Sequence, residues 1–492
     1  MIMRIPKSLK SEHKLFFNEI FIWAILFLFS FILRVLLKSD CLFHGDTISY
    51  IEYIKLNAVG GDEKGGVIYS LMILGLNIIL SPFNFIPEDI IIFTSILMAS
   101  FSVVLLYLFV KKLTNNLFVS FISAFLFSLS PIFLSESTNG IYHSTSAFFV
   151  ILTAYFILLA SQKDSSWLYI LSGIFYGTAI GVRITNVLFI FPFILIYFLN
   201  QKKEKISKIK FKKKDIINLS IIFTACLIVI FLSYYKTFDL SGILFWMNID
   251  TFTPSVNLFL FSLELLSKNF IYWWWLIFIL GIFYLSKKDR TTLIILLTWW
   301  LSYFLYFGMV VTTKPRFYTI ASLPLWIIIA YGFLYLSQLE INKLKFKKIS
   351  IVILIILIIN MLFIIYPVLK FRHDYCGPKE MALFFKENTE QNAIIFTERY
   401  DGHVSFYGNR KNQGFEGIKV FKQKINIAIN NNTPIYVSET FLLFPGNEIA
   451  AYMLKNEYDL ILVGEVLSEN FNAASIRSRK FIERLYKVNK RN

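Results

Sequence analysis

The sequence has few charged residues and few cysteines for its length. Only 16% of its 492 residues are charged, whereas soluble proteins carry about a quarter. The three cysteines, Cys41, Cys226 and Cys376, show no metal-binding spacing and predict no disulfide framework. Cys226 lies within an apolar run, so we expect it to be a packing residue. These shortages exclude an ordinary soluble fold, a cysteine-based metal centre and a disulfide-rich scaffold.

Familiar short motifs are missing as well. No soluble nucleotide-binding motif is present, and the last part of the chain has neither a glycine-rich phosphate fingerprint nor a nucleophile motif. Apolar residues are abundant instead: 56% of the chain is hydrophobic, 53 residues are Phe, and Ile/Leu runs reach membrane-spanning length. The sequence therefore predicts an α-helical polytopic membrane protein.

The net charge of +17 does not indicate a nucleic-acid partner, because its location argues for a membrane instead. Eight lysines lie between Lys202 and Lys214, in one loop between apolar segments. Basic loops of this kind mark the cytoplasmic side of a membrane. The partner indicated by the charge pattern is therefore the membrane itself.

About eleven transmembrane helices are predicted. The first apolar run continues to spanning length without a small-residue cleavage site, so we expect no cleavable signal peptide. A cytoplasmic N-terminus places every strongly basic loop on one side. Val67–Leu80 is apolar but too short for a span of roughly twenty residues, so we expect a helix in the outer interface. The spans lie near 20–37, 90–110, 117–134, 141–160, 167–182, 184–199, 216–235, 269–285, 291–311, 317–337 and 349–366.

The composition changes after Pro367. Strand-length apolar runs at Ala393–Thr397, Pro434–Val437 and Leu460–Val463 alternate with helix-like segments near 378–388, 421–430 and 446–455. This alternation predicts a small α/β domain, which the topology places outside the cytoplasm. We therefore divide the chain into a transmembrane domain, residues 1–367 with an external loop at 38–89, and an extracytoplasmic α/β domain, residues 368–492. Its expected role is structural or in acceptor recognition.

Several polar residues stand at the predicted external face. Asp46 and His44 follow the first span, and ionisable groups at membrane depth are costly enough to be candidate site residues. The topology brings other candidates to the same face: Tyr50, Glu136, His143, Arg183, Lys314 and Arg316. Such a set suits transfer from a phosphate-activated donor. A carboxylate deprotonates the acceptor, and Arg and Lys neutralise the leaving phosphate.

Each candidate also has a simpler interpretation. Asp46 is placed as a helix N-cap would be, and Arg183 as a residue that caps or snorkels at a helix end. Lys314 and Arg316 fit a charged turn, His143 a neighbour of a cap, and Glu136 a surface turn. A divalent metal held by His44, Asp46, Glu136 and His143 is chemically feasible, but the long spacing defines no ligand set. No other cofactor is indicated.

The order of these features resembles the GT-C superfamily of membrane glycosyltransferases, in particular the branch of protein O-mannosyltransferases and aminoarabinose transferases. The resemblance covers nearly the whole membrane region. No one of its motifs is specific, whereas the ordered set of four is moderately so. The four passages are Gly45–Tyr53, Ser130–Glu136 running into 141–160, Gly173–Asn186, and Pro315–Tyr318 through Ser322–Pro324.

The resemblance implies a polyprenyl-phosphate-sugar donor, inversion at the anomeric carbon and Asp46 as general base. In the leading hypothesis, Arg183, Lys314 and Arg316 hold the donor phosphate. The sequence departs from the family where Thr47 replaces a frequent second acid, and where Tyr142-His143 replaces Thr-Asp or Thr-Glu. The second acidic role, for which Glu136 and His143 are candidates, is therefore left open, as is any metal dependence.

The leading hypothesis is a glycosyltransferase of the cell membrane that moves a sugar from a polyprenyl phosphate to an extracytoplasmic lipid, glycan or protein. Tyr50, His143, His44 and Glu136 are then expected to position substrate or form a second polar site. A transporter or lipid-carrier flippase is the alternative, although charges at one face and the lack of an evident internal repeat favour the transferase. A third option is an envelope-assembly scaffold that works through its C-terminal part.

Overall fold

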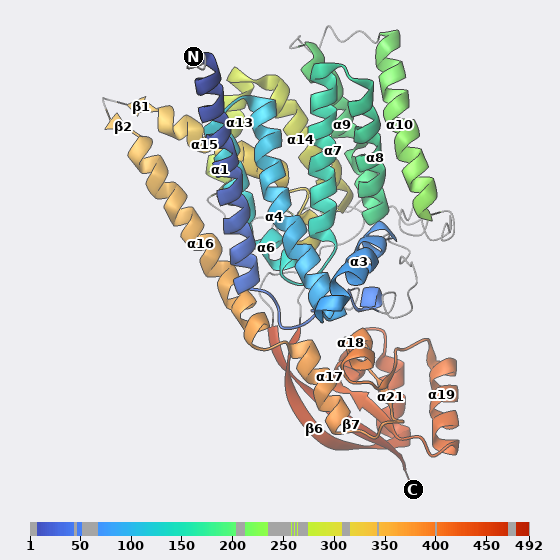
Figure 1. The fold of residues 1–492 in the computed structure, drawn as a ribbon. Helices are drawn as coiled ribbons and strands as arrows, with labels where there is room; N and C mark the ends of the chain where they lie inside the picture. Colours follow the sequence, from blue (N-terminus) through green and yellow to red (C-terminus); the bar gives the residue numbers. More distant parts are fainter. Residues whose placement is uncertain are drawn as a thin grey trace.

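A long helical bundle and a smaller sheet with helices, placed end to end, form the molecule (Figure 1). The N-terminal helix begins at the far end of the bundle, and the chain ends at the far end of the sheet. The computed structural model describes residues 7–43, 47–51, 67–202, 212–234, 257, 260, 263, 274–307, 315–341, 344–398, 401–470 and 479–491.

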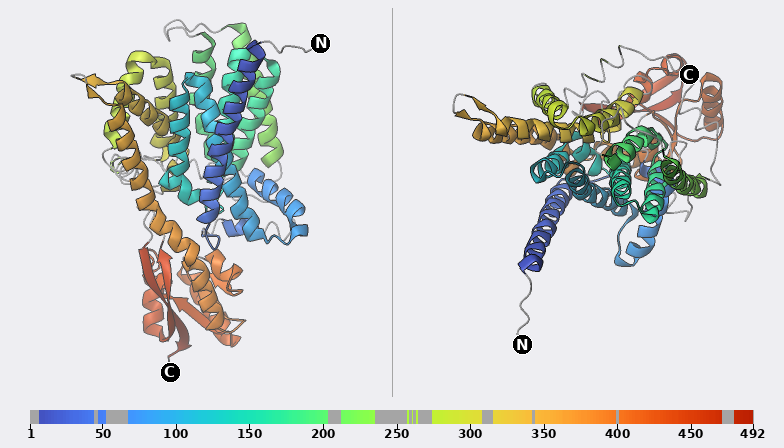
Figure 2. Two further views of the ribbon diagram at one scale, coloured as in Figure 1. Left: turned by 60° about the vertical axis from the view of Figure 1, so that its left-hand side comes forward. Right: turned by 90° about the horizontal axis from the view of Figure 1, so that it is seen from above.

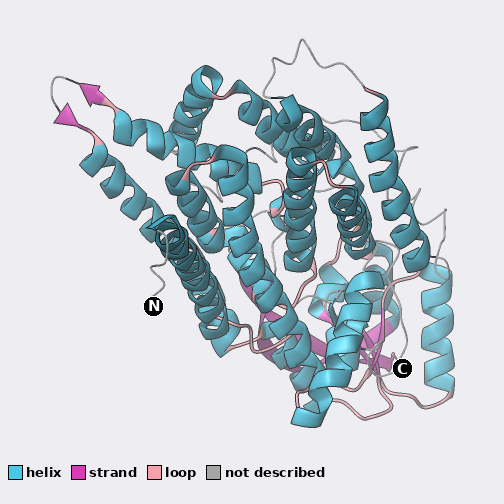
Figure 3. Ribbon diagram, turned by 45° about the horizontal axis from the view of Figure 1, so that its top comes forward, coloured by secondary structure: helices cyan, strands magenta, loops and turns pink. Residues whose placement is uncertain are grey.

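The helices of the bundle run alternately toward and away from the sheet (Figures 1 and 3). Five helices of the described part are long and apolar enough to cross a membrane, or six if the bent pair α5–α6 counts as one span. The count of eleven spans therefore stays a prediction. The main helices are α1 (Lys7–Leu36), α3 (Val67–Leu80), α4 (Pro87–Thr114), α5 (Leu117–Leu129), α6 (Pro131–Ser137), α7 (His143–Lys163), α8 (Ser166–Val182), α9 (Ile190–Lys202), α10 (Lys213–Tyr234), α13 (Trp274–Lys288), α14 (Arg290–Tyr306), α15 (Leu323–Gln338) and α16 (Lys347–Asp374).

Two predicted spans differ from the structure at prolines. The span predicted at 117–134 breaks at Ser130, where α5 and α6 meet at a bend of 57°. Ser130 is extended because the ring of Pro131 disfavours helical geometry in the residue before it. By contrast, α16 continues through Pro367 to Asp374, beyond the predicted end at 366.

Short 3₁₀ segments supply other differences. The segment η2 (Ile184–Phe189) precedes α9, and η6 (Pro315–Tyr318) precedes α15, which begins six residues later than the predicted span. The fourteen-residue helix α3 forms as expected, with Val67, Tyr69 and Ile73 buried. It lies at the end of the bundle that faces the sheet (Figure 1).

The chain after α16 folds as a five-stranded sheet with helices. The strand order is β4-β3-β5-β7-β6, parallel among β4, β3 and β5 and antiparallel at β7. Strands β3, β5 and β6 occupy the three predicted strand segments, whereas β4 and β7 were not predicted. The elements are α17 (Gly377–Glu387), β3 (Ile394–Phe396), α18 (Asp401–Phe406), β4 (Lys411–Gln413), α19 (Ile418–Asn430), β5 (Ile435–Ser438), α20 (Glu439–Leu443), α21 (Glu448–Glu457), β6 (Tyr458–Asn470) and β7 (Arg479–Lys490).

A disulfide joins Cys41 to Cys376, so the prediction of no disulfide was wrong. The two Cα atoms are 6.0 Å apart although 335 residues separate them in the sequence. Only the path of α16, which returns past the end of α1 to the sheet, brings the cysteines together (Figure 2). Sequence spacing carries no signal for such a pairing. Cys226 is free and buried, as expected for a packing residue.

Candidate functional site

Arg183 lies at the centre of the candidate site, directly after the last residue of α8. Its side chain is 3% exposed, and its Nη1 donates to Nδ1 of His143, the first residue of α7, at 3.2 Å. Since an arginine can only donate, Nδ1 of His143 must be unprotonated. The two predicted site residues therefore meet, and the imidazole acts as an acceptor toward the guanidinium.

Aromatic rings surround the Arg183 guanidinium. Its Cζ atom lies 4.7 Å from the ring centre of Phe317 and 5.1 Å from that of Phe307. Tyr303, on α14, adds a third ring at 6.0 Å. Arg316 also lies over the Phe317 ring, at 5.5 Å. The structure thus brings two of the predicted phosphate-binding residues, Arg183 and Arg316, to one aromatic ring, which attracts cations through its negative face.

The charge of Arg183 has no carboxylate partner in the described part of the chain. Arg34, a buried arginine of α1, provides a contrast. It donates to the hydroxyls of Ser30 and Ser137 and to the carbonyls of Ser30 and Ser128, at 2.6–3.1 Å. A guanidinium has five N–H donors. Those of Arg34 are largely engaged by protein oxygens. Arg183 makes one side-chain hydrogen bond to the described residues, which suits it to an anionic ligand.

Tyr50 reaches the same site through two further tyrosines. Its ring packs edge-to-face on Tyr69 at 4.9 Å and on Tyr142 at 6.4 Å. The Tyr142 ring lies 4.9 Å from the ring of His143. Tyr69 is fixed by its hydroxyl, which donates to the carbonyl of Gly140 at 3.0 Å. Tyr50, predicted to position substrate, is thus connected to Arg183 through a continuous line of rings.

Glu136 is buried, contrary to its interpretation as a surface turn. It lies on α6, which contacts the 3₁₀ segment η6 that carries Arg316. Asn139, between α6 and α7, is a residue that sequence reasoning missed. Its side chain is fully buried, and neither its amide oxygen nor its amide nitrogen has a hydrogen-bond partner among the described residues. Since nearly all buried polar groups are paired, Asn139 is a further candidate for contact with substrate.

Three predicted site residues, His44, Asp46 and Lys314, lie outside the described residues. Within the described ranges, no group of three or more His, Cys, Asp or Glu side chains is arranged to hold a metal ion.

Two buried arginines were also missed. Arg34 stands inside the first apolar run, where an arginine is itself a signal, since charges at membrane depth are costly. Arg372, near the end of α16, donates to the hydroxyl of Ser135 at 3.0 Å and lies over the Phe43 ring at 4.1 Å. Arg34 joins α1 to α5 and α6 through its hydrogen bonds to Ser128 and Ser137, and Arg372 joins α16 to α6.

Comparison with known proteins supports a membrane glycosyltransferase fold. Residues 74–234 match the family model described as dolichyl-phosphate-mannose-protein mannosyltransferase. No curated protein matches the chain by sequence.

Solved structures are similar over most of the chain. ArnT from Cupriavidus metallidurans, bound to undecaprenyl phosphate, has a TM-score of 0.58 at 9% identity, covering 95% of this chain and 97% of its own. The oligosaccharyltransferase of Archaeoglobus fulgidus, tethered to an acceptor peptide, has a TM-score of 0.55 at 13% identity, covering 91% of this chain and 72% of its own. Together with the family match, this similarity confirms the resemblance that the sequence indicated: the protein is a membrane protein with the fold of the GT-C superfamily.

Proposed function

We propose that the protein is a glycosyltransferase that moves a sugar from a polyprenyl-phosphate-linked donor to an extracytoplasmic lipid, glycan or protein. The observation that carries this proposal is the buried Arg183, which donates to a His143 nitrogen, lies among aromatic rings and has no carboxylate partner among the described residues. Burying a charge without compensation is costly, so such a site favours an anion. A phosphate at the head of a lipid carrier is an anion that reaches this depth.

The proposed reaction is a single displacement. Asp46 accepts the proton of the acceptor hydroxyl or amine while that atom bonds to the anomeric carbon, with inversion, and the bond from this carbon to the phosphate oxygen breaks. Negative charge grows on the phosphate, where Arg183, Arg316 and Lys314 stabilise it. Tyr50 and His143 position the sugar, and His44 and Glu136 complete the polar surroundings.

The proposal includes the membrane arrangement. About eleven spans within residues 1–367 would form the transferase, with a cytoplasmic N-terminus, and residues 368–492 would form an extracytoplasmic domain. In support, α7 begins and α8 ends on the side of the bundle that faces the sheet (Figure 1). Donor phosphate and acceptor would meet on this side.

An Asp46→Asn variant tests the proposal most directly. Membranes containing the protein are incubated with a panel of radiolabelled polyprenyl-phosphate sugars, and labelled acceptor is counted. Loss of a general base lowers the rate by about 100-fold or more, so transfer should fall by this factor at normal insertion.

The matched control is Asp374→Asn, which removes an exposed carboxylate paired with Lys370 at the end of α16. This variant should transfer sugar at the normal rate. Full activity of Asp46→Asn would reject the base assignment. Movement of labelled lipid across sealed vesicles without any covalent product would instead support the flippase alternative.

A further inference from the structure

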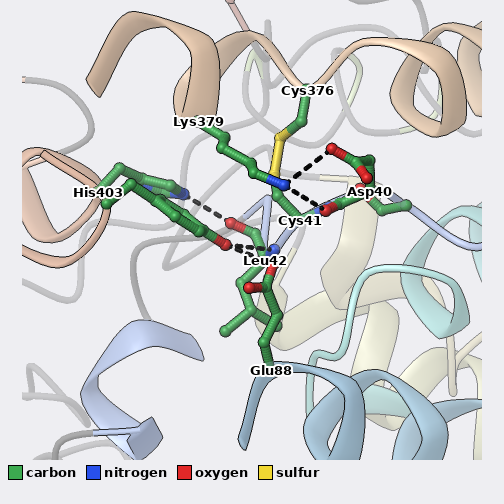
Figure 4. The surroundings of a disulfide bond; sticks show 9 residues. Asp40, Cys41, Leu42, Glu88, Cys376, Lys379 and His403 are labelled. Carbon is green, nitrogen blue, oxygen red and sulfur yellow. Dashed lines mark hydrogen bonds and ion pairs between the residues drawn. A yellow bond between two sulfur atoms is a disulfide. The ribbon is translucent and has the colours of Figure 1, made fainter. Parts of the chain in front are cut away.

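The segment Ser39–Phe43, which directly precedes the proposed catalytic loop, is held by side chains from the C-terminal part of the chain (Figure 4). Lys379 of α17 forms an ion pair with Asp40 at 3.0 Å. His403 of α18 donates from Nε2 to the carbonyl of Leu42 at 2.7 Å. The Cys41–Cys376 disulfide adds a covalent connection at the same place.

Tyr407, directly after α18, connects this segment to the bundle. Its hydroxyl accepts from the backbone N–H of Leu42 at 3.1 Å and donates to Oε1 of Glu88, on α4, at 2.6 Å. Both backbone hydrogen-bonding groups of the buried Leu42 are therefore satisfied by side chains of the C-terminal part. Since unpaired buried backbone groups are costly, these contacts fix the path of the chain at Leu42.

The described residues on the other side of 44–46 belong to the same apolar cluster as Leu42. Ile48, Tyr50 and Ile51 are buried in one apolar cluster with Leu42, and Phe406 and Tyr407 pack against this cluster. His403 and Tyr407 thus hold Leu42 directly, and Phe406 and Tyr407 pack against the cluster that contains Leu42, Ile48, Tyr50 and Ile51. Tyr50 belongs at once to this cluster and to the line of rings that reaches His143.

We propose that α17 and α18 hold the segment Ser39–Phe43 and thereby position Asp46 for catalysis, with Lys379, His403 and Tyr407 as positioning residues. This inference rests on the proposed function, since it assigns the C-terminal part a role in the reaction beyond structure or acceptor recognition. A catalytic group must be held within about 0.5 Å of its productive place, and its supporting residues set that precision. None of the three residues needs to touch substrate.

Tyr407→Phe is the most selective test, and Tyr436→Phe is its matched control. Both substitutions remove a tyrosine hydroxyl that donates to a glutamate at 2.6 Å, Glu88 for Tyr407 and Glu390 for Tyr436. Tyr436 lies on β5, within the sheet. Hydrogen exchange of peptides covering residues 38–51 and the kcat and KM of sugar transfer are measured on both full-length variants.

Tyr407→Phe should raise exchange in residues 38–51 and lower kcat by about 10- to 100-fold, the effect of a misplacement near 1 Å. The KM for the donor should stay unchanged, because Arg183 and Arg316 are untouched. Tyr436→Phe should change neither quantity. A second pair, His403→Gln and His403→Ala, checks the contact to Leu42: the glutamine amide still donates and should retain most of kcat, whereas alanine should not.

The outcomes separate this inference from the proposed function. Unchanged exchange in Tyr407→Phe, or raised exchange with normal kcat, overturns the positioning role. Equal losses of kcat in Tyr407→Phe and Tyr436→Phe also overturn the positioning role, since they indicate a general loss of stability. If the unmodified protein transfers no sugar from any donor while Tyr407→Phe still raises exchange in residues 38–51, the proposed function fails and the contact between the two parts is supported.

Discussion

At the residue scale, Asn139 is a buried polar residue whose side chain does not contribute to stability through hydrogen bonds to the described residues and is therefore a candidate for a role in function. Its amide is fully buried and has no hydrogen-bond partner in the part of the chain that the structure describes, and a buried amide left unpaired costs about 1–3 kcal/mol of folding free energy. Sites that contact substrate often carry such a cost. The residue stands between α6, which carries Glu136, and α7, which begins at His143.

We predict that Asn139→Ala will lower sugar transfer at least 10-fold without lowering the melting temperature, because it removes an amide that stabilises nothing in the described structure. Asn186→Ala is the contrasting variant. The Asn186 amide nitrogen donates to the Ser146 hydroxyl and the Ala179 carbonyl, both at 2.7 Å. Its loss should lower the melting temperature. The melting temperature in detergent and the rate of sugar transfer are measured for both variants. A clearly lower melting temperature of Asn139→Ala would contradict the assignment of Asn139 to substrate contact.

His403 makes the contact between α18 and the segment Ser39–Phe43 sensitive to pH. Burial lowers the pKa of His403 to about 4, and the hydrogen bond to the Leu42 carbonyl opposes this effect. The unfolded histidine therefore binds a proton at higher pH than the folded one. Stability from this group is complete above about pH 6.5 and is lost as the pH falls toward 4, by on the order of 3 kcal/mol.

We predict that the free energy of unfolding will fall less steeply between pH 6.5 and 4 in His403→Gln than in the unmodified protein. Glutamine keeps a donor for Leu42 but does not titrate. Tyr407, Glu88, Lys379 and Asp40 are the other titratable groups at this contact, and they are common to both proteins. The difference between the two pH profiles therefore measures the contribution of the His403 imidazole to the free energy of unfolding. Identical profiles from denaturant unfolding would refute the role of His403.

At the scale of elements, small residues set how closely α8 and α10 pack. A Cβ atom built on Gly173 would lie 2.3 Å from the carbonyl oxygen of Ile222, and one on Gly177 would lie 2.7 Å from that of Cys226. Spacing by four residues places both glycines on one face of α8, the pattern by which membrane helices approach closely. Arg183 follows α8 directly, so this packing also places the candidate site.

We predict that Gly173→Ala will destabilise the protein by about 1–3 kcal/mol, the usual cost of forcing an extra carbon into a tight contact. Gly75→Ala is the matched control in α3, where a Cβ atom meets nothing within 4 Å. That substitution should be neutral or stabilise by up to about 1 kcal/mol through helix propensity. Thermal unfolding of the two variants under the same conditions provides the comparison, and equal melting temperatures would contradict the packing argument.

Helices were easier to predict from the sequence than the contacts between them. Apolar runs located α4 and α7 to within four residues at each end, because long helices repeat one signal many times. The break at Pro131 and the passage of α16 through Pro367 depend on the packing around each proline, which a local pattern does not contain. Strand β7 was missed since it is rich in charge and buries Glu483, whose carboxylate accepts from the backbone N–H of Thr440 at 2.9 Å.

The candidate site was predictable in part, because the positions of the helices determine which residues lie at one face. Membrane topology alone indicated that Arg183, Arg316 and His143 gather at one face, and the structure brings Arg183 into contact with His143 and both arginines to Phe317. The aromatic rings and the unpaired amide of Asn139 depend on side-chain packing between distant segments. Sequence order does not encode these contacts locally, so only the structure reveals them.

For the whole molecule, two independent features indicate the orientation in the membrane. Lysine pairs stand at the last turns of α4 and α13, Lys111–Lys112 and Lys287–Lys288, at the bundle end away from the sheet (Figure 1). Such residues favour the cytoplasmic side. The Cys41–Cys376 disulfide joins the chain after α1 to the start of α17, which lies where the bundle meets the sheet (Figure 1). Disulfides persist in oxidising compartments outside the cytoplasm.

We predict that the sheet is extracytoplasmic. Alkaline phosphatase fused after Asn492 should be active in a bacterial host, because this enzyme needs an oxidising compartment, and a green fluorescent protein fused there should be dark. Fusions of the same reporters between Lys287 and Lys288 should behave in the opposite way. Maleimide labelling of the denatured, unreduced protein should modify Cys226 alone, and reduction should expose all three cysteines. A fluorescent C-terminal fusion together with three reactive thiols before reduction would invert the orientation and move the proposed transfer reaction to the cytoplasmic side.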